Sequence, residues 1–311
     1  MDPFLPLFRN PHWETIAGRF WPRPSGFPAH ETLYSTEPGV QVKVQTQCPA
    51  CEPKGALLLV HGLEGSSAAG YMRSLSRRAL DCGYTAHRFN LRSCGGTENL
   101  ANTGYHGGLT TDLLAVLRQL VAERSRPLWL VRFSLGGNLV CKLAGELGND
   151  ASRWIAGVCA ASPAIDLGAC ARRIGEPDNR LYEYGFVRNM RKRARVMGRL
   201  PRHALNDIRT VIELDERITA PAFGFRGAEH YYTTQSANRF LGAIRVPTLI
   251  IAAKDDTFVP SSIYDHAAIQ SNPHIQLVLT EHGGHLGFIA RNRPRLWLDY
   301  AIMDWIQQKG T

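Results

Sequence analysis

Short runs of apolar residues, each about the length of a strand, alternate along the chain with segments whose apolar residues recur at helical spacing. Several of the runs are continuously apolar, a pattern typical of strands that are buried on both faces of a parallel sheet. This alternation predicts an α/β fold in which a mostly parallel central sheet is flanked by helices. The predicted strands cover residues 56–62, 84–92, 127–133, 154–162, 247–253 and 275–280.

Two of the predicted helices have a clear apolar side. Residues 109–125 place Leu and Val side chains on one side of a helix, with Thr110 or Thr111 as its N-terminal cap. Residues 293–309 form a second amphipathic pattern near the end of the chain.

The alternation of strands and helices breaks between about residues 166 and 245. This segment has helical character, is basic, is interrupted by Gly and Pro, and contains no convincing buried strand. Such an insertion predicts a helical cap or lid over the carboxyl edge of the sheet, where open α/β sheets bind ligands. We expect one domain over residues 1–311, with the cap at 166–245 and an N-terminal arm, residues 1–30, that packs on the body.

Cysteine usage and the N-terminal sequence bear on the compartment. The seven cysteines are odd in number and lie mostly in apolar strand or helix patterns, which favours reduced thiols in the cytoplasm. No signal peptide and no membrane span is predicted, because the chain has neither a basic region followed by an apolar one nor about 18 consecutive apolar residues. Cys48 and Cys51 have CxxC spacing, but without a second such pair a plain loop is favoured over a zinc or redox site. We expect no metal and no cofactor.

The formal net charge of +9 is unevenly distributed. The segment from Arg188 to Arg199 is rich in Arg and Lys and contains no acidic residue. A solvated face of a helical insertion is the favoured interpretation, and weak contact with an anionic lipid surface or an anionic substrate head group is the alternative. No recognisable nucleic-acid module accompanies the charge, so a nucleic-acid partner is not expected. The sequence gives no indication of the oligomeric state.

Ser134 is the candidate nucleophile. It lies where the predicted strand at 127–133 passes directly into a helical pattern that begins with Leu135. A serine at such a sharp strand-to-helix turn has its hydroxyl exposed above the sheet, and the turn directs the N–H of Leu135 at a developing oxyanion. The second oxyanion donor is expected from the backbone N–H of Leu63, in the Gly-rich turn after the strand at 56–62.

A serine nucleophile needs a base, and the base needs a group that orients it. The strand at 247–253 is followed by Asp255 and Asp256, and the strand at 275–280 is followed by His282 and His285. All three loops are expected at one edge of the sheet, which places an acid and a base near Ser134. We favour Asp256, which begins the segment DTFVP, and His285, whose preceding glycines allow it to approach the serine; His282 is expected to lie at the surface or behind the catalytic groups.

The ordered motifs HGLEGSS, NLRSCGG, TGYHGG, FSLGGN, AKDDTFVP and TEHGGHLGF resemble the YheT-like branch of the α/β-hydrolase superfamily, as does the N-terminal segment NPHWETI. The resemblance covers nearly the whole chain. It implies an α/β-hydrolase fold with an inserted cap, and it implies Ser134 as nucleophile, Asp256 as acid and His285 as base. The implied activity is that of a serine esterase, class EC 3.1.1, acting on small-molecule carboxylic esters with short to medium acyl chains. Acyl transfer, phospholipase or thioesterase activity with the same triad is the alternative.

Arg132 departs from the branch pattern, which has glycine two residues before the nucleophile. An unpaired buried charge would cost several kcal/mol, so we expect the Arg132 head group to reach water or a carboxylate, and it is a candidate lining residue of the substrate pocket. If it distorts the turn, the protein is a catalytically weak binding protein instead of an enzyme. Tyr105 and His106 recur in the matched motifs as scaffold residues or, alternatively, as pocket-lining residues.

Overall fold

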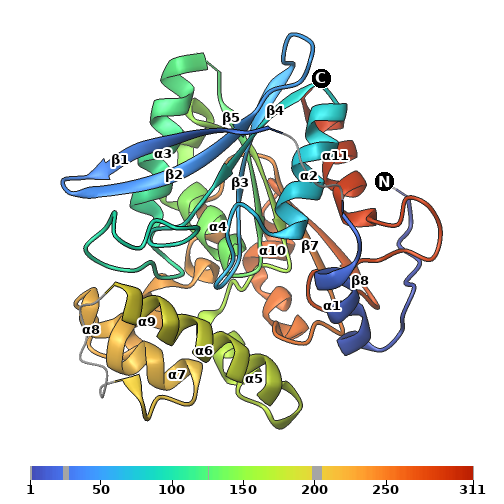
Figure 1. Ribbon diagram of the computed structural model, residues 1–311. Coiled ribbons are helices and arrows are strands. Elements are labelled where there is room, and N and C mark those ends of the chain that lie inside the picture. Colours follow the sequence, from blue (N-terminus) through green and yellow to red (C-terminus); the bar gives the residue numbers. More distant parts are fainter. Residues whose placement is uncertain (1, 24–27, 125, 198–204, 311) are drawn as a thin grey trace.

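An eight-stranded sheet forms the centre of the computed structural model, which describes residues 2–23, 28–124, 126–197 and 205–310 (Figure 1). The strand order is β1-β2-β4-β3-β5-β6-β7-β8. The first two strands run antiparallel to their neighbours, and all other neighbouring pairs are parallel. The strands are β1 (His30–Glu37), β2 (Val40–Gln47), β3 (Gly55–Val60), β4 (Tyr84–Phe89), β5 (Leu128–Phe133), β6 (Ile155–Ala161), β7 (Thr248–Ala253) and β8 (Ile275–Thr280).

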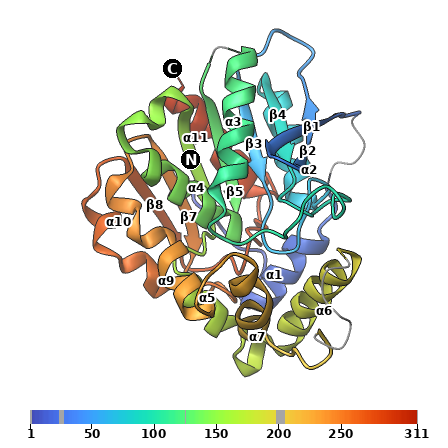
Figure 2. The same ribbon diagram turned by 90° about the vertical axis from the view of Figure 1, so that its left-hand side faces the viewer.

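Helices cover both faces of this sheet (Figures 1 and 2). One hydrophobic core lies between the sheet and α2 and α11, and a larger one lies on the other face beneath α3 and α4 and extends into the helices between β6 and β7. The α-helices described outside that insertion are α1 (Pro11–Phe20), α2 (Gly70–Asp81), α3 (Thr110–Arg124), α4 (Leu135–Leu147), α10 (Ala267–Ser271) and α11 (Trp297–Lys309).

The predicted α/β fold with its mostly parallel sheet is confirmed. Every residue of β5 and of β7 is buried, as expected for strands covered on both faces. The strands β1 and β2 are absent from the sequence prediction. They form an antiparallel edge ribbon in which β1 is mostly exposed and β2 alternates buried with half-buried residues, so both lack a continuous apolar run.

The segment between β6 and β7 lies together at the carboxyl edge of the sheet, at the lower side of Figure 1. Its described residues are helical or irregular and contain no strand. Residues 198–204 of the predicted cap, and residues 24–27 of the predicted N-terminal arm, lie outside the described residues. The α-helices of this segment are α5 (Leu167–Ile174), α6 (Arg180–Val196), α7 (Val211–Leu214), α8 (Ala220–Ala222) and α9 (Ala228–Gln235), and the π-helical turn Asp215–Thr219 joins α7 to α8.

The N-terminal helix α1 begins at an asparagine cap. The Asn10 side chain accepts hydrogen bonds from the N–H groups of His12 and Trp13, and Pro11 occupies the first helical position. Glu14, Thr15 and Gly18 are its buried residues. Within the described residues, no helix combines the length and the apolar character that crossing a bilayer requires.

Candidate active site

Ser134 lies in a strained turn between β5 and α4. Its φ of 57° is in the left-handed region, which a non-glycine residue adopts only when its surroundings hold it there. The turn needs glycine at neighbouring positions, because a Cβ at Gly62 would lie 3.0 Å from Ser134 Cβ and a Cβ at Gly137 would lie 2.4 Å from Pro163 Cβ. This close packing raises the serine above the end of the sheet.

Asp256 and His285 form a buried pair in the loops after β7 and β8. The two Asp256 carboxylate oxygens lie 2.9 and 3.0 Å from His285 Nδ1. Asp256 Oδ1 also accepts hydrogen bonds from the backbone N–H groups of Phe258 and Val259, at 2.9 and 3.0 Å. The carboxylate is therefore fixed in place, and it holds the imidazole with Nδ1 protonated and Nε2 facing away from the acid.

The neighbouring acid and imidazole pair with each other. Asp255 Oδ2 lies 3.0 Å from His282 Nδ1, and Asp255 Oδ1 accepts a hydrogen bond from Gly284 N at 2.9 Å. The His282 side chain is 36% exposed, whereas that of His285 is 8% exposed. The structure thus separates the four candidate residues into an inner pair, Asp256–His285, and an outer pair that supports the loop.

Ser134 and His285 approach the same region from different strands. Phe258 lines a cavity together with Ser134, and its ring centroid lies 4.7 Å from that of His285. Within the described part of the chain, no hydrogen bond joins Ser134 Oγ to His285. In serine hydrolases without substrate, catalytic hydrogen bonds of this kind are often long and tighten only in the complex.

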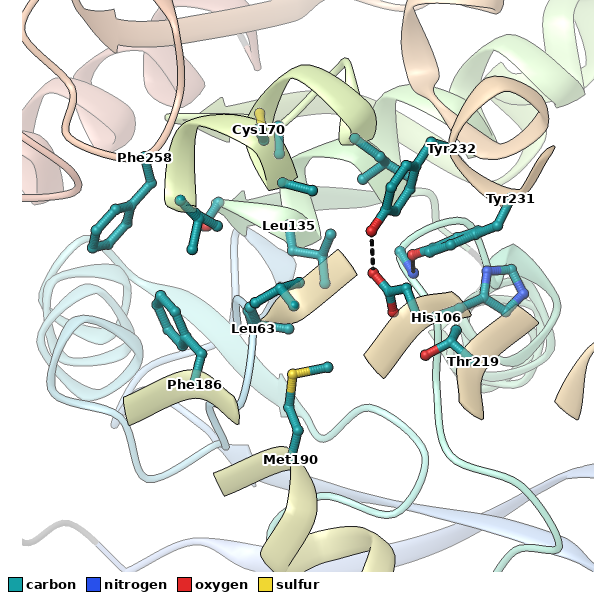
Figure 3. A pocket seen from close by; sticks show the side chains of 18 of the residues that line it. Leu63, His106, Leu135, Cys170, Phe186, Met190, Thr219, Tyr231, Tyr232 and Phe258 are labelled. Carbon is teal, nitrogen blue, oxygen red and sulfur yellow. Dashed lines mark hydrogen bonds between the residues drawn. The ribbon is translucent and has the colours of Figure 1, made fainter. Parts of the chain in front are cut away.

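The cavity beside Ser134 encloses about 70 Å³ between the sheet edge and the helices that follow β6. Figure 3 shows Leu63 and Leu135 at its centre, with Phe186 and Phe258 on one side and Tyr232 on the other. The lining is mainly apolar. The dashed line in Figure 3 marks the 2.7 Å hydrogen bond from Tyr232 Oη to Asp215 Oδ2, and burial raises the pKa of Asp215 to about 6.

Both candidate oxyanion donors belong to residues that line this cavity. The Leu135 N–H is the first amide of α4, where helical amides have no intrahelical acceptor. The amides on either side of Leu63 are already occupied: Gly62 N donates to Tyr71 Oη at 3.0 Å, and Glu64 N donates to Tyr105 Oη at 2.9 Å. The Leu63 N–H, which lies between these two amides, has no hydrogen-bond acceptor among the described residues.

Tyr105 and His106 also line the cavity. The His106 ring lies edge-on against the rings of Phe223, Phe225 and Tyr231, and its Nδ1 accepts a hydrogen bond from Gly108 N. Burial lowers the pKa of His106 to about 3, so this imidazole stays neutral at physiological pH. It shapes the wall and carries no charge for catalysis.

The expectation for Arg132 is wrong. Its side chain is completely buried beneath the turn, it does not line the cavity, and within the described residues it forms no ion pair. Nη1 donates to Gly136 O at 3.0 Å, whereas Nε and Nη2 have no hydrogen-bond partner among those residues. Burial lowers the pKa of Arg132 well below its usual value. The turn accommodates the long side chain by enclosing it rather than by directing it to water.

Two supports of the site come from α1, which sequence reasoning did not connect to it. Thr15 Oγ1 accepts a hydrogen bond from His285 N, and the Glu14 carboxylate accepts hydrogen bonds from Phe8 N and Ile289 N. A Cβ at Gly284 would lie 2.6 Å from Thr15 Oγ1, so the histidine loop lies directly against α1. The only sequence signal was the NPHWETI segment, which the resemblance matched without assigning a role to it.

The basic segment from Arg188 is not a uniform solvated face. Its last residues, 198–199, lie outside the described residues. Arg188, Lys192 and Arg195 are exposed on α6, but the Arg193 side chain turns inward and is 14% exposed. Contact with anionic lipid stays a prediction. All seven cysteines are unpaired, and the described residues contain no group of three or more His, Cys, Asp or Glu side chains placed to hold a metal ion.

Comparison with known proteins identifies the family. A model described as "Alpha/beta hydrolase family" matches residues 57–297. The chain is 34% identical to YheT of Escherichia coli (strain K12), over 97% of this chain and 92% of that protein. It is 29% identical to phospholipase ABHD3 of Mus musculus, over 81% of this chain and 63% of that protein.

The fold also matches solved structures. An esterase of Pyrococcus furiosus superposes with a TM-score of 0.61 at 19% identity, covering 93% of this chain and 97% of that one. This likeness concerns the fold alone, because the sequence identity is low. Together with the family match and the identity to YheT, it leads to one conclusion: the chain belongs to the α/β-hydrolase family, in its YheT-like branch.

Proposed function

We propose that the protein is a serine hydrolase that cleaves carboxylic esters through an acyl-enzyme, with Ser134 as nucleophile, His285 as base and Asp256 as the orienting acid. The observation that carries this proposal is the buried Asp256–His285 pair, which presents an oriented imidazole at the same sheet edge as a serine with φ of 57°. The names of relatives such as phospholipase ABHD3 support an ester substrate.

Acylation follows from this arrangement. Ser134 Oγ attacks the ester carbonyl carbon while its proton moves to His285 Nε2, and Asp256 stabilises the imidazolium that forms. The carbonyl oxygen becomes an oxyanion that accepts hydrogen bonds from the Leu63 and Leu135 amides. The bond to the alkoxide then breaks, and the alkoxide takes the proton from His285, which leaves the acyl group on Ser134.

Deacylation repeats these steps with water. His285 takes a proton from water, whose oxygen attacks the acyl carbon, and the oxyanion again forms in front of Leu63 and Leu135. The carboxylic acid leaves as the proton returns to Ser134 Oγ. An alcohol in place of the water would transfer the acyl group instead of hydrolysing it.

The dimensions of the cavity favour esters with short to medium acyl chains. The cavity of about 70 Å³ at Ser134 is lined mainly by apolar side chains, including those of Phe186 and Phe258, whose rings lie edge to face on one side of it. Met190 and Thr219 also line a second cavity of about 410 Å³ farther from the serine. An acyl chain that fills the first space can extend toward the second.

Labelling with a fluorophosphonate tests the proposal, because this reagent phosphonylates an activated serine. Wild type, Ser134→Ala and the control Ser152→Ala, which changes an exposed serine, are compared after circular dichroism shows that each is folded. We expect Ser134 to be modified in wild type and in Ser152→Ala, with no labelling of Ser134→Ala. Turnover of a p-nitrophenyl ester should fall by at least about 10⁴-fold in Ser134→Ala.

One result would overturn the proposal, and another would change the proposed reaction. A folded wild type that is neither labelled nor active on esters from two to twelve carbons would overturn the proposal and favour a binding protein that keeps the fold. Labelling at Ser134 with ester products in preference to acid, in the presence of added alcohol, would make the protein an acyltransferase with the same triad.

A further inference from the structure

Glu64 follows the proposed oxyanion donor Leu63 and has an unusual backbone conformation. Its φ is 52°, in the left-handed region, where a long acidic side chain is uncommon. Its side chain is also only 7% exposed. A residue in this conformation persists only when surrounding contacts determine it, and the direction of the Leu63 N–H depends on the same turn.

Tyr105 provides the first of these contacts. Its hydroxyl accepts a hydrogen bond from Glu64 N at 2.9 Å and lies 3.2 Å from Glu64 Oε1, to which it donates. Burial raises the pKa of Tyr105 well above its usual value, so the hydroxyl keeps the proton that it donates. Backbone and side chain of Glu64 are therefore both bound to one phenol.

Arg193 provides the second contact from α6, which lies in the segment between β6 and β7. Arg193 Nη2 lies 2.7 Å from Glu64 Oε1, and its guanidinium carbon lies 4.5 Å from the centre of the Tyr105 ring. Nη1 lies 3.4 Å from Ser93 Oγ. Burial alone would lower the pKa of Arg193, but the neighbouring Glu64 carboxylate, together with Tyr105 and Cys94, raises it, so the guanidinium keeps its charge.

Fold stability is a poor explanation for this pair. Removing two charges from water costs nearly as much as their attraction returns, so buried ion pairs are seldom strong stabilisers of a fold. Their geometric demands are strict, however, and they can specify one arrangement of the parts that they join. Here the joined parts are α6 and the turn that carries Leu63.

We infer that Arg193 and Glu64 are positioning residues, and that their ion pair, supported by Tyr105, holds the Leu63 N–H in the oxyanion site. Catalysis then requires that α6 packs against the turn that carries Leu63, in addition to any role of α6 in enclosing the substrate. The inference rests on the proposed hydrolase function. Glu64 does not line the cavity beside Ser134, whereas Arg193 lines it with a side chain that is paired with Glu64. In this proposal both residues act through the backbone of the turn.

The inference predicts a loss in kcat with little change in KM. Removal of a complete oxyanion donor costs about 10²–10³-fold in kcat, and misdirection of one donor should cost about 10–100-fold. The same variants should bind a trifluoromethyl ketone more weakly by a similar factor, because its tetrahedral adduct places an oxyanion in this site. If the ion pair only stabilised the fold, kcat and the affinity for the ketone would not fall by similar factors.

The experiment compares wild type, Arg193→Gln, Glu64→Gln and the double variant on a soluble p-nitrophenyl ester, with Ki of the ketone measured in each. Arg188→Gln, which changes an exposed arginine of the same helix, is the control. Tyr105→Phe removes only the hydroxyl, and it replaces a charge variant in the comparison if that variant does not fold. We expect the two single variants to lose about 10–100-fold in kcat, and the double variant to lose far less than the product of the single losses.

The possible failures are distinguishable. If wild type is not labelled at Ser134 and has no ester activity, the proposed function fails and this inference fails with it. If wild type is active but the variants match Arg188→Gln in kcat, or raise KM while kcat and ketone Ki stay unchanged, only the positioning role is overturned. In that case the ion pair serves to hold α6 in place.

Discussion

The side-chain oxygen of Thr15 accepts a hydrogen bond from the backbone amide of His285, 2.8 Å away and 270 positions further along the chain. The same hydroxyl donates to Pro11 O at 2.7 Å. The N-terminal helix is therefore part of the frame that holds the proposed base. Directly before His285 the loop contains Gly283 and Gly284, both at positive φ, which have no side chains with which to hold the histidine.

Thr15→Val should lower kcat on a soluble ester by about 10-fold to 100-fold and leave KM nearly unchanged. Valine keeps the shape but leaves the buried His285 amide without an acceptor, and a small displacement of a catalytic group is costly. Steady-state kinetics checks this, with Thr15→Ser as the variant that restores the acceptor and hence most of the activity. Equal losses in both variants would show that packing, and not the hydrogen bond, is what matters here.

Changing Asp256 to asparagine should lower kcat far more than the same change at Asp255. Asp256→Asn removes the carboxylate that orients His285, a change that costs about 10⁴-fold in kcat in an operative triad. Asp255→Asn disturbs only the outer pair with His282 and the bond from Gly284 N, so kcat should fall less than about tenfold. Parallel kinetics of the two variants measures the contrast. A larger loss at Asp255 would transfer the acid role to the outer pair.

Arg132→Met should stabilise the fold and leave turnover within about threefold of wild type. It replaces a buried guanidinium that lacks an ion-pair partner among the described residues with an apolar chain of similar length. Replacing even a paired buried charge by apolar side chains is often neutral or stabilising by about 1–4 kcal/mol, and removing an unpaired one should outweigh the lost hydrogen bond to Gly136 O. Denaturant unfolding and ester kinetics together test the prediction. Loss of turnover in a folded, more stable variant would make the Arg132 charge part of the mechanism.

The sequence predicted those parts of the site that depend on single strand ends. Ser134, Asp256 and His285 each follow a strand that the sequence predicted, and parallel strands bring their ends to one edge of a sheet. The pairing of Asp256 with His285 was favoured from local sequence, and the structure brings these two residues together. That much follows from connectivity alone.

Contacts between distant segments were not predictable in the same way. Thr15 reaches the histidine loop, and Arg193 reaches the turn after β3, only because helices that are remote in sequence pack beside them. In the sequence, Arg193 is one residue of a basic run, and nothing distinguishes it from its exposed neighbours. The error at Arg132 has a related cause, since the depth of its burial is set by the packing of the turn around it.

The buried carboxyl group of Glu14 in α1 should make the free energy of unfolding depend on pH. Its side chain is fully buried, and its carboxylate accepts hydrogen bonds from Phe8 N and Ile289 N. Loss of water contact outweighs these bonds and raises the pKa of Glu14 from 4.5 to about 7, with Asp255 raising it further and His282 opposing the rise. A carboxyl group with a raised folded-state pKa favours the folded state when it is protonated.

The free energy of unfolding should therefore fall as pH rises from about 4.5 to about 7 through this group, and it should level off above that range. In this window the unfolded chain releases the Glu14 proton before the folded protein does, which is worth up to about 3 kcal/mol. Urea unfolding at several pH values, for wild type and Glu14→Gln, measures the difference between the two curves. Exposed Glu52→Gln is the control and should follow wild type. In the contrary outcome, the free energies of unfolding of wild type and Glu14→Gln would differ by the same amount at every pH from 4.5 to 8. That result would show that Glu14 does not titrate in this window and that its two hydrogen bonds keep it ionised.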